Sequence, residues 1–226
     1  MSDEIKYVYL KAHPLFAHFS DPKLKDICNI VKIKTVFRGE TIGYGDGNYS
    51  KIYFLVKGKI KITESDEADN ELVKDILMDG DIFGDLALEG RPSMDENAEA
   101  LMANTIIACF NVFDFKKLLS DNPAMALQYA SRVSGKLKRM EDRHADLVFR
   151  DAKARLIRFI KHWARMDGSR VGDKIILNNY LTHSDIAGVI STSRQSVNVF
   201  LNELRDSGML HYNRKRIELN NPVAWN

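Results

Sequence analysis

The sequence predicts an α+β chain built of three consecutive parts, and three patterns support this division. Short apolar segments separated by glycines extend from about Val36 to Phe113, which is typical of a small antiparallel barrel or jelly roll. An apolar heptad repeat follows, and a short helix, a turn and a longer helix occur near the C-terminus. We therefore expect a β-roll in residues 1–121, a long dimerisation helix in residues 122–150 and a winged helix-turn-helix in residues 151–226.

The composition indicates a globular protein. The 226 residues are 45% hydrophobic and 28% charged, and no stretch approaches the roughly 20 consecutive apolar residues of a membrane-spanning helix. The charged start, Met1-Ser2-Asp3-Glu4, lacks the apolar core of a secretory signal. We expect a cytoplasmic protein with no membrane partner.

The two cysteines, Cys28 and Cys109, are interpreted as buried small apolar side chains. Two thiols cannot supply a four-cysteine iron–sulfur or zinc site within one chain, and a disulfide is disfavoured in a reducing compartment. We therefore expect no cofactor and no metal. Haem ligation by His13 or His18 would rest on residue type alone.

Two strands are predicted on either side of Lys57-Gly58, at Ile52–Val56 and Lys59–Ile62. Their β-branched and aromatic residues favour strands, and the glycine between them suits a tight turn joining an antiparallel pair. Ile106–Phe110 is apolar throughout, which predicts a strand that is buried on both faces.

A long helix is predicted to begin at Asn122-Pro123, with asparagine as its cap and proline in its first turn. Apolar residues then recur at alternating spacings of four and three, with charged residues between them. They are Ala126, Ala130, Val133, Leu137, Met140, His144 and Leu147. So narrow a seam favours pairing with the same helix of a second copy, and the alternative is that it packs against the strand domain. His144 is interpreted as a partly exposed member of the seam.

A helix-turn-helix is predicted after Leu181. Thr182-His183-Ser184-Asp185 has the pattern of a capping box and opens a short helix. The chain turns at Ser191-Thr192-Ser193, and a longer helix runs from Arg194 to about Ser207. In DNA-binding proteins with this arrangement, the second helix enters the major groove.

The polar face of the longer helix carries chemistry suited to DNA. Arg194 matches the guanine edge, while Gln195 and Asn198 match the adenine edge. Three hydroxyl residues near the two helix starts are candidate phosphate contacts, namely Thr182, Ser193 and Ser196. The alternative interpretation is the solvated face of an ordinary helix.

A β-hairpin wing is predicted beyond Gly208. Met209–Tyr212 and Ile217–Leu219 bracket a basic tip in which Arg214, Lys215 and Arg216 are further candidate phosphate contacts. Residues 151–226 hold twelve basic and seven acidic residues, a net charge of +5, against −3 for residues 1–150. A polyanionic partner is therefore expected at the C-terminal end.

From about Leu15 to Leu219 the chain resembles the cyclic-AMP receptor / fumarate-nitrate regulator (CRP/FNR) family. Three stretches carry the resemblance: Arg38-Gly39-Glu40 with Gly45-Asp46, Ile52-Tyr53-Phe54-Leu55 and Gly58; Gly80-Asp81-Ile82-Phe83-Gly84-Asp85-Leu86; and Leu181-Thr182 through Ser193-Arg194-Gln195-Ser196-Val197-Asn198. The resemblance implies a cyclic-nucleotide-binding-like β-roll that binds a small-molecule effector. It also implies a homodimer that binds palindromic double-stranded DNA and acts on RNA polymerase.

The resemblance places base reading at Arg194, Gln195 and Asn198. Gln195 stands where many members have glutamate, and Val199 stands where the cyclic-AMP receptor has an arginine. We therefore expect a different preferred half-site.

The expected effector pocket departs further from cyclic-nucleotide binders. Its candidate residues are Gly84, Asp85, Leu86, Arg91, Met140 and Glu141. Met94-Asp95-Glu96-Asn97 brings carboxylates to the place of the arginine that neutralises the cyclic phosphate, and Met140-Glu141 replaces a Thr-Ser pair that touches adenine. A buried phosphate would be opposed by like charge, so the unknown effector is expected not to be cyclic AMP.

The sequence bears on three classes of function. The leading hypothesis is a sequence-specific, homodimeric transcription regulator. The alternative is a small-molecule sensing module whose β-roll is the working part. An enzyme is not expected, because the sequence has no Walker loop, HExxH, GxSxG or kinase signature.

Overall fold

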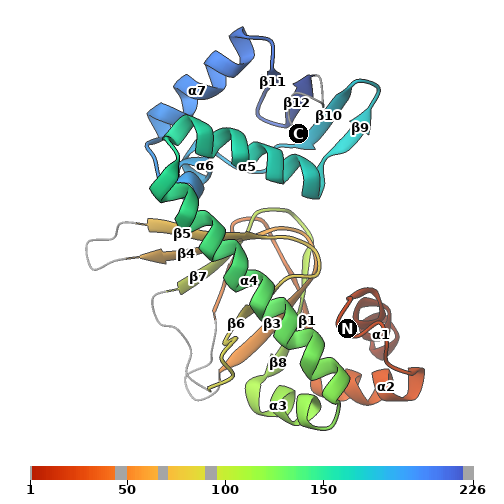
Figure 1. The fold of residues 1–226 in the computed structure, drawn as a ribbon. Helices are drawn as coiled ribbons and strands as arrows, with labels where there is room; N and C mark the ends of the chain where they lie inside the picture. Colours follow the sequence, from red (N-terminus) through yellow and green to blue (C-terminus); the bar gives the residue numbers. More distant parts are fainter. Residues whose placement is uncertain (1, 44–49, 66–70, 90–95, 221–226) are drawn as a thin grey trace. The chain divides into compact units, whose positions relative to one another are not determined.

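The computed structural model describes residues 2–43, 50–65, 71–89 and 96–220. Figure 1 shows the helices and strands along the chain. Contacts between residues divide the chain into two compact units, Met1–Arg139 and Met140–Asn226. None of the helices in the described ranges combines the length and apolar character required to cross a bilayer.

The first unit is built on two four-stranded sheets whose neighbouring strands are antiparallel. The strand order is β1-β8-β3-β6 in one sheet and β2-β7-β4-β5 in the other. The strands are β1 (Lys32–Val36), β2 (Thr41–Ile42), β3 (Lys51–Lys57), β4 (Ile60–Ser65), β5 (Glu71–Leu77), β6 (Ile82–Gly84), β7 (Glu96–Ala100) and β8 (Thr105–Asn111). The helices are α1 (Asp3–Ala12), α2 (Asp21–Ile30), α3 (Val112–Ser120) and the start of α4 (Pro123–Phe149). The predicted β-roll is confirmed.

The sheet β1-β8-β3-β6 is covered on both faces, which explains the unbroken apolar run of β8. Successive residues of a strand point to opposite faces. Ile107 and Cys109 lie in a core with residues of the second sheet, such as Ile62 and Ala98. Ala108 and Phe110 face a second core that includes helical residues. The predicted burial of β8 and of both cysteines is confirmed.

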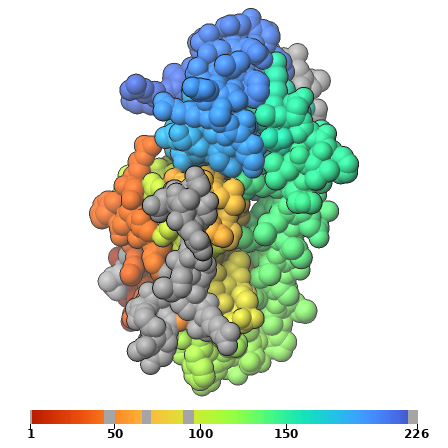
Figure 2. All heavy atoms as spheres, turned by 90° about the vertical axis from the view of Figure 1, so that its left-hand side faces the viewer, coloured from red at the N-terminus to blue at the C-terminus, as the bar shows by residue number. Residues whose placement is uncertain are grey.

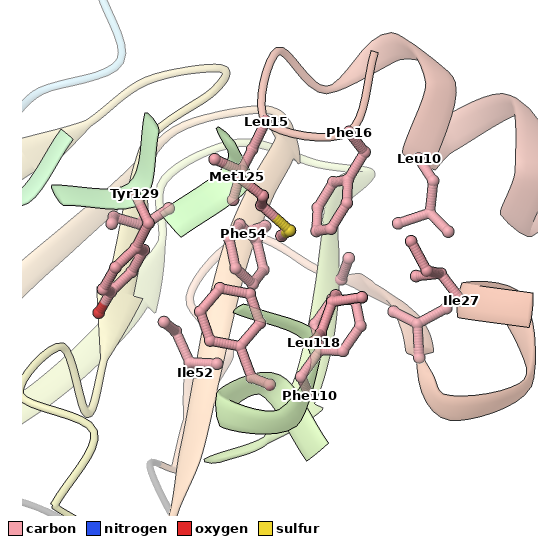
Figure 3. Packing of buried hydrophobic residues seen from close by; sticks show 14 of the residues in the cluster. Leu10, Leu15, Phe16, Ile27, Ile52, Phe54, Phe110, Leu118, Met125 and Tyr129 are labelled. Atoms are coloured by element: carbon pink, nitrogen blue, oxygen red, sulfur yellow. The ribbon is translucent and has the colours of Figure 1, made fainter. Parts of the chain in front are cut away.

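The second core joins α1, α2, α3 and α4 to the sheet through aromatic side chains. The Phe54 ring contacts Phe16, Phe110 and Phe115 at centroid distances of 5.2, 5.4 and 5.2 Å. Figure 3 shows Tyr129 of α4 beside this cluster, with its hydroxyl pointing away from Phe54. Because these side chains are fully buried or nearly so, α4 is anchored to the β-roll by its first turns.

The predicted tight turn at Lys57-Gly58 joins strands of different sheets, so the prediction of an antiparallel pair was wrong. β3 pairs with β6 and β8, whereas β4 pairs with β5 and β7. Gly58 has a φ of +116°, and a Cβ placed there would lie 2.5 Å from Thr105 Oγ1. The glycine therefore lets the chain pass close to β8 as it crosses to the second sheet.

Helix α4 shows different chemistry on two sides. One side packs on the β-roll through Met125, Tyr129, Arg132 and Lys136. Arg132 Nη1 donates to Gly80 O at 2.7 Å, and Lys136 Nζ lies 3.8 Å from Asp75 Oδ2. The other side exposes apolar groups such as Leu137, whose side chain is 57% exposed. Figure 2 shows the green atoms of this part of the chain at the surface.

Up to Asn220, where its described residues end, the second unit contains the last turns of α4, three further helices and one antiparallel sheet of order β11-β12-β10-β9. The elements are α5 (Ala152–Asp167), β9 (Ser169–Val171), β10 (Lys174–Asn178), α6 (His183–Ile190), α7 (Arg194–Asp206), β11 (Leu210–Tyr212) and β12 (Arg216–Asn220). Trp163, Ile186, Leu201 and Ile217 are among its fully buried side chains. The predicted winged helix-turn-helix is confirmed, and the added hairpin of β9 and β10 widens its sheet.

Candidate functional site

The first helix of the helix-turn-helix begins with the predicted capping box. Thr182 Oγ1 accepts from Asp185 N at 3.1 Å, and Asp185 Oδ2 accepts from Thr182 N at 2.8 Å. These two bonds satisfy backbone donors that have no partner within a helix. The start of α6 is therefore fixed locally, by residues three positions apart.

The turn between α6 and α7 has a defined conformation. Ser191 ends α6 in the left-handed region, with a φ of +53°. Ser193 caps α7 by accepting from Ser196 N at 3.0 Å, and the two serine hydroxyls lie 2.9 Å apart. Ser193 and Ser196 are thus brought together beside the first turn of α7.

Helix α7 separates a buried face from an exposed one. Val197, Leu201 and Leu204 are buried in the core of the second unit. Arg194, Gln195 and Asn198 are exposed. The structure therefore brings the three predicted base-reading residues to one surface, within two turns of the start of the helix.

These three side chains line a hollow of about 710 Å³ together with His183 and Val199. His183 belongs to α6, and its ring centroid lies 5.8 Å from that of Tyr212 on β11. We did not predict His183 as a site residue, because its place beside α7 depends on how the two helices pack. The only signal in the sequence was a histidine directly after Thr182, the cap of this helix.

The predicted wing is formed by β11 and β12, whose register pairs Tyr212 with Ile217. Arg214 and Lys215 lie exposed between the strands, and Asn213 Oδ1 accepts from Lys215 N at 2.8 Å. Arg216 begins β12, and its Nε lies 3.1 Å from Glu218 Oε1. Arg214 and Lys215 are therefore at the tip of the wing. Arg216 lies at the start of β12, where Glu218 partly neutralises its charge.

The candidate effector residues of the β-roll gather at the turn after β6. Gly84 has a φ of +91°, and Asp85 is buried with its Oδ1 accepting from Glu89 N at 3.3 Å. Tyr129 Oη donates to Leu86 O at 2.5 Å, and burial and the nearby Asp85 carboxylate raise the pKa of the Tyr129 phenol. Tyr129 was missed, since nothing in its local sequence says which side of α4 faces this turn.

The other candidate effector residues belong to the second unit or lie outside the described residues. Arg91, Met94 and Asp95 lie outside the described residues, as do Gly45 and Asp46. Met140 and Glu141 are exposed and belong to the second unit. Glu96 Oε2 lies 2.6 Å from Lys74 Nζ, so this carboxylate already has a cation beside it.

The predicted dimerisation seam is largely exposed within one chain. Ala130, Leu137, Met140, His144 and Leu147 are exposed, Ala126 is half-buried, and Val133 is half-buried against the aromatic core. The side of α4 that packs on the strands is a different one, through Met125 and Tyr129. Packing against the strand domain therefore accounts for little of the seam apart from Val133.

Comparison with known proteins agrees with both parts of the fold. The family model described as "Cyclic nucleotide-binding domain" matches residues 34–122, and that described as "Crp-like helix-turn-helix domain" matches residues 154–224. The structure of FixK2 from Bradyrhizobium japonicum has a TM-score of 0.73 at 20% identity, covering 87% of this chain and 96% of that one. This likeness shows the shared fold.

Curated relatives match over most of their length. The "Global nitrogen regulator" of Synechococcus elongatus is 30% identical over 196 residues, 86% of this chain and 88% of the relative. The "CRP-like cAMP-activated global transcriptional regulator" of Mycobacterium tuberculosis is 24% identical over 184 residues, 80% of each chain. The order of domains, the fold and these matches together place the chain in one family: it belongs to the CRP/FNR family of transcription regulators.

Proposed function

We propose that the protein is a sequence-specific transcription regulator that reads double-stranded DNA through α7 as a homodimer. The observation that carries this proposal is the shared exposure of Arg194, Gln195 and Asn198 around one hollow. An arginine fork pairs with guanine O6 and N7, and glutamine or asparagine pairs with the adenine edge. In a helix-turn-helix the first turns of the second helix meet the base edges.

Phosphate contacts hold the same helix in register on the duplex. Ser193 and Ser196 offer hydroxyls at the first turn of α7, and Thr182 is exposed at the start of α6. In the wing, Arg214 and Lys215 are exposed at the tip and are stronger candidates than Arg216, which lies beside Glu218. Phosphate contacts position a protein on DNA and carry no sequence information directly.

A mobility-shift or anisotropy titration of wild type and Arg194→Ala tests the base-reading assignment. The DNA is a palindromic duplex selected by the wild-type protein from a random library. Loss of a bidentate contact costs about 1–3 kcal/mol in each half-site, which weakens binding by roughly 5- to 150-fold per half-site and relaxes the preference at one base pair there.

Arg205→Ala is the matched control, because Arg205 is an exposed cation on the last turn of α7, bonded to Asp206 Oδ1 at 3.0 Å. It is expected to retain both affinity and preference. Equal binding by wild type and Arg194→Ala at several salt concentrations would show that Arg194 does not read a base.

The remaining assignments complete this proposal. The three functional parts are residues 1–121, 122–150 and 151–226, and the seam of α4 pairs two copies so that two α7 helices address a palindromic site. The protein works in the cytoplasm, acts on RNA polymerase, and binds rather than catalyses. Exposed apolar side chains at Leu137, Met140 and Leu147 support the pairing, since a partner helix would cover them.

A second role, small-molecule binding by the β-roll, is favoured by the family match of residues 34–122. We propose an effector other than cyclic AMP at the turn formed by Gly84, Asp85 and Leu86, with Arg91, Met140 and Glu141 as further candidates. The hydrogen bond that the Tyr129 hydroxyl of α4 donates to Leu86 O supports coupling of this turn to α4. Calorimetry with cyclic AMP and other anionic metabolites tests the proposal, and micromolar binding of cyclic AMP would contradict it.

A further inference from the structure

One histidine shares the hollow at α7 with all three proposed base-reading residues. His183 is half-buried on α6, while Arg194, Gln195 and Asn198 reach the hollow from α7. The first helix of a helix-turn-helix crosses the DNA backbone, whereas the second enters the groove. A side chain of α6 in this position therefore faces a phosphate when α7 meets the bases.

The His183 ring is held in place by a chain of contacts. It packs on the Tyr212 ring at a centroid distance of 5.8 Å and an interplanar angle of 55°. Tyr212 Oη donates to Asn202 Oδ1 at 3.0 Å, which fixes the tyrosine against α7. The imidazole is thus presented to the hollow by two neighbouring elements.

The surroundings of His183 disfavour the charged form of the imidazole in the free protein. Burial and the positive charge of Arg194 lower the pKa of His183 below its usual range. Within the described part of the chain, the Arg194 guanidinium of α7 and the Tyr212 phenol of β11 face the ring from neighbouring elements. On its own helix, the Asp185 carboxylate is bonded to Thr182 N and Oγ1 at 2.8 and 2.7 Å.

A DNA phosphate beside the ring favours the charged form of the imidazole instead. Its negative charge offsets that of Arg194 and attracts a proton to the imidazole, because an opposite charge within a few ångström favours the charged form. A neutral imidazole contributes one N–H bond, whereas the imidazolium forms a charge-assisted bond that is roughly twice as strong. Binding of DNA and binding of a proton at His183 therefore favour each other.

We propose that His183 contacts a DNA backbone phosphate as an imidazolium, so that each subunit takes up a proton when it binds DNA and binds more tightly as the pH falls. This inference rests on the proposed DNA-reading function. It adds a phosphate contact from α6 and makes acidity a signal that acts directly on the DNA-binding surface.

The experiment measures the affinity of the full-length protein for a random-sequence duplex, since phosphate contacts do not depend on sequence. Anisotropy titrations are made from about pH 5.5 to 8 at low salt, near 50 mM. Wild type is expected to bind more tightly as the pH falls, by up to tenfold per pH unit for each subunit. His183→Gln is expected to remove most of this dependence.

His211→Gln is the matched control. His211 lies on β11 next to Tyr212, is exposed, and points to the opposite face of the strand. Its pH dependence should follow that of wild type. At pH 6 the slope of log affinity against log salt should be about 0.9 smaller per subunit for His183→Gln than for wild type.

Proton uptake by the wild-type protein is measured separately, by calorimetry of the same titration in buffers of different ionisation enthalpy near pH 6.5. Net uptake that disappears in His183→Gln supports the proposal. Binding that is independent of pH, or a pH dependence that survives in His183→Gln, overturns it and leaves the proposed function intact. Failure to bind any duplex at low salt overturns the proposed function itself.

Discussion

The guanidinium of Arg155 on α5 donates from Nε to Ile190 O, the last residue of α6, at 2.8 Å. Its Nη2 donates to Ser191 O at 3.0 Å and its Nη1 to Arg150 O at 2.7 Å. One planar cation thereby satisfies carbonyls at the helix-turn-helix turn and directly after α4. Arg155 is thus a positioning residue for the turn on which the orientation of α7 depends.

Replacing Arg155 with alanine is expected to destabilise the second unit by about 2 kcal/mol, because hydrogen bonds to charged groups are lost and carbonyls are left without partners. Arg155→Lys should recover only part of this loss, since an ammonium lacks the planar fork. Urea unfolding followed by tryptophan fluorescence reports on this unit, because Trp163 is buried in its core.

Lys153→Ala provides the control on the same helix. Lys153 Nζ lies 2.6 Å from Glu203 Oε2 in an exposed ion pair, so its loss should cost less than about 1 kcal/mol. If Arg155→Ala unfolded at the same urea concentration as Lys153→Ala, the proposed role of Arg155 in fixing the turn would be wrong.

Gly84→Ala is expected to destabilise the β-roll severely. Gly84 has a φ of +91°, and an added Cβ would lie 2.5 Å from Lys51 O of the neighbouring strand. Gly39→Ala separates the two causes, because Gly39 has a φ of +81° but nothing within 4 Å of an added Cβ. Gly39→Ala should therefore cost only about 1–2 kcal/mol for the left-handed backbone. Thermal unfolding by circular dichroism should rank wild type above Gly39→Ala, and Gly39→Ala well above Gly84→Ala.

Acid is expected to destabilise the first unit through His13. Burial and the nearby charge of Arg132 lower the pKa of His13 to about 3, against 6.5 for an ordinary histidine. The ring packs against Phe16 and Phe54. Between these two pH values His13 is protonated in the unfolded chain but not in the folded chain. The free energy of unfolding therefore has its full value above about pH 6.5 and declines as the pH falls toward 3. The decline is at most about 1.4 kcal/mol per pH unit from this residue.

His13→Asn should flatten that decline while keeping an acceptor for Leu15 N, which donates to His13 Nδ1 at 3.2 Å. The exposed His18 gives the control, and His18→Asn should leave the acid dependence as it is in wild type. Urea unfolding by far-ultraviolet circular dichroism at several pH values checks this. Parallel curves for wild type and His13→Asn would contradict the prediction.

Leu137→Asp is expected to convert a dimer into a monomer without unfolding the chain. Leu137 is 57% exposed within one chain, so a carboxylate there meets water until a partner helix approaches. Ser131→Asp places the same charge at an exposed position outside the seam and should remain dimeric. Light scattering coupled to size exclusion gives the mass directly. A dimer mass for Leu137→Asp would place the interface elsewhere.

Much of the fold could be predicted because its signals are local. The capping box at Thr182 and Asp185 involves residues three positions apart, and the stripe of Val197, Leu201 and Leu204 follows the helical period. The exposed face of α7 follows from the same period, so Arg194, Gln195 and Asn198 could be grouped before their positions were known. The apolar run of β8 similarly indicates burial on both faces.

Other features could not be predicted because they depend on which segments pack together. Gly58 reads as a hairpin turn, yet β3 and β4 enter different sheets, and only their distant partners β8 and β7 decide this. Tyr129 reaches Leu86 across 43 positions of sequence, and Arg155 reaches Ser191 across 36. Such contacts leave no trace in local composition.

By itself, the sequence determined the order of the three parts, the start of each functional helix and the face on which α7 is polar. These properties follow from backbone hydrogen bonding and side-chain periodicity over a few residues. Only the tertiary structure decided that His183 shares a hollow with Arg194, that Arg155 holds the turn, and that α4 faces the β-roll with Tyr129 and Arg132. These relationships join residues far apart in the chain, because apolar burial determines the neighbours and hydrogen bonds then form between the polar groups that this packing brings together.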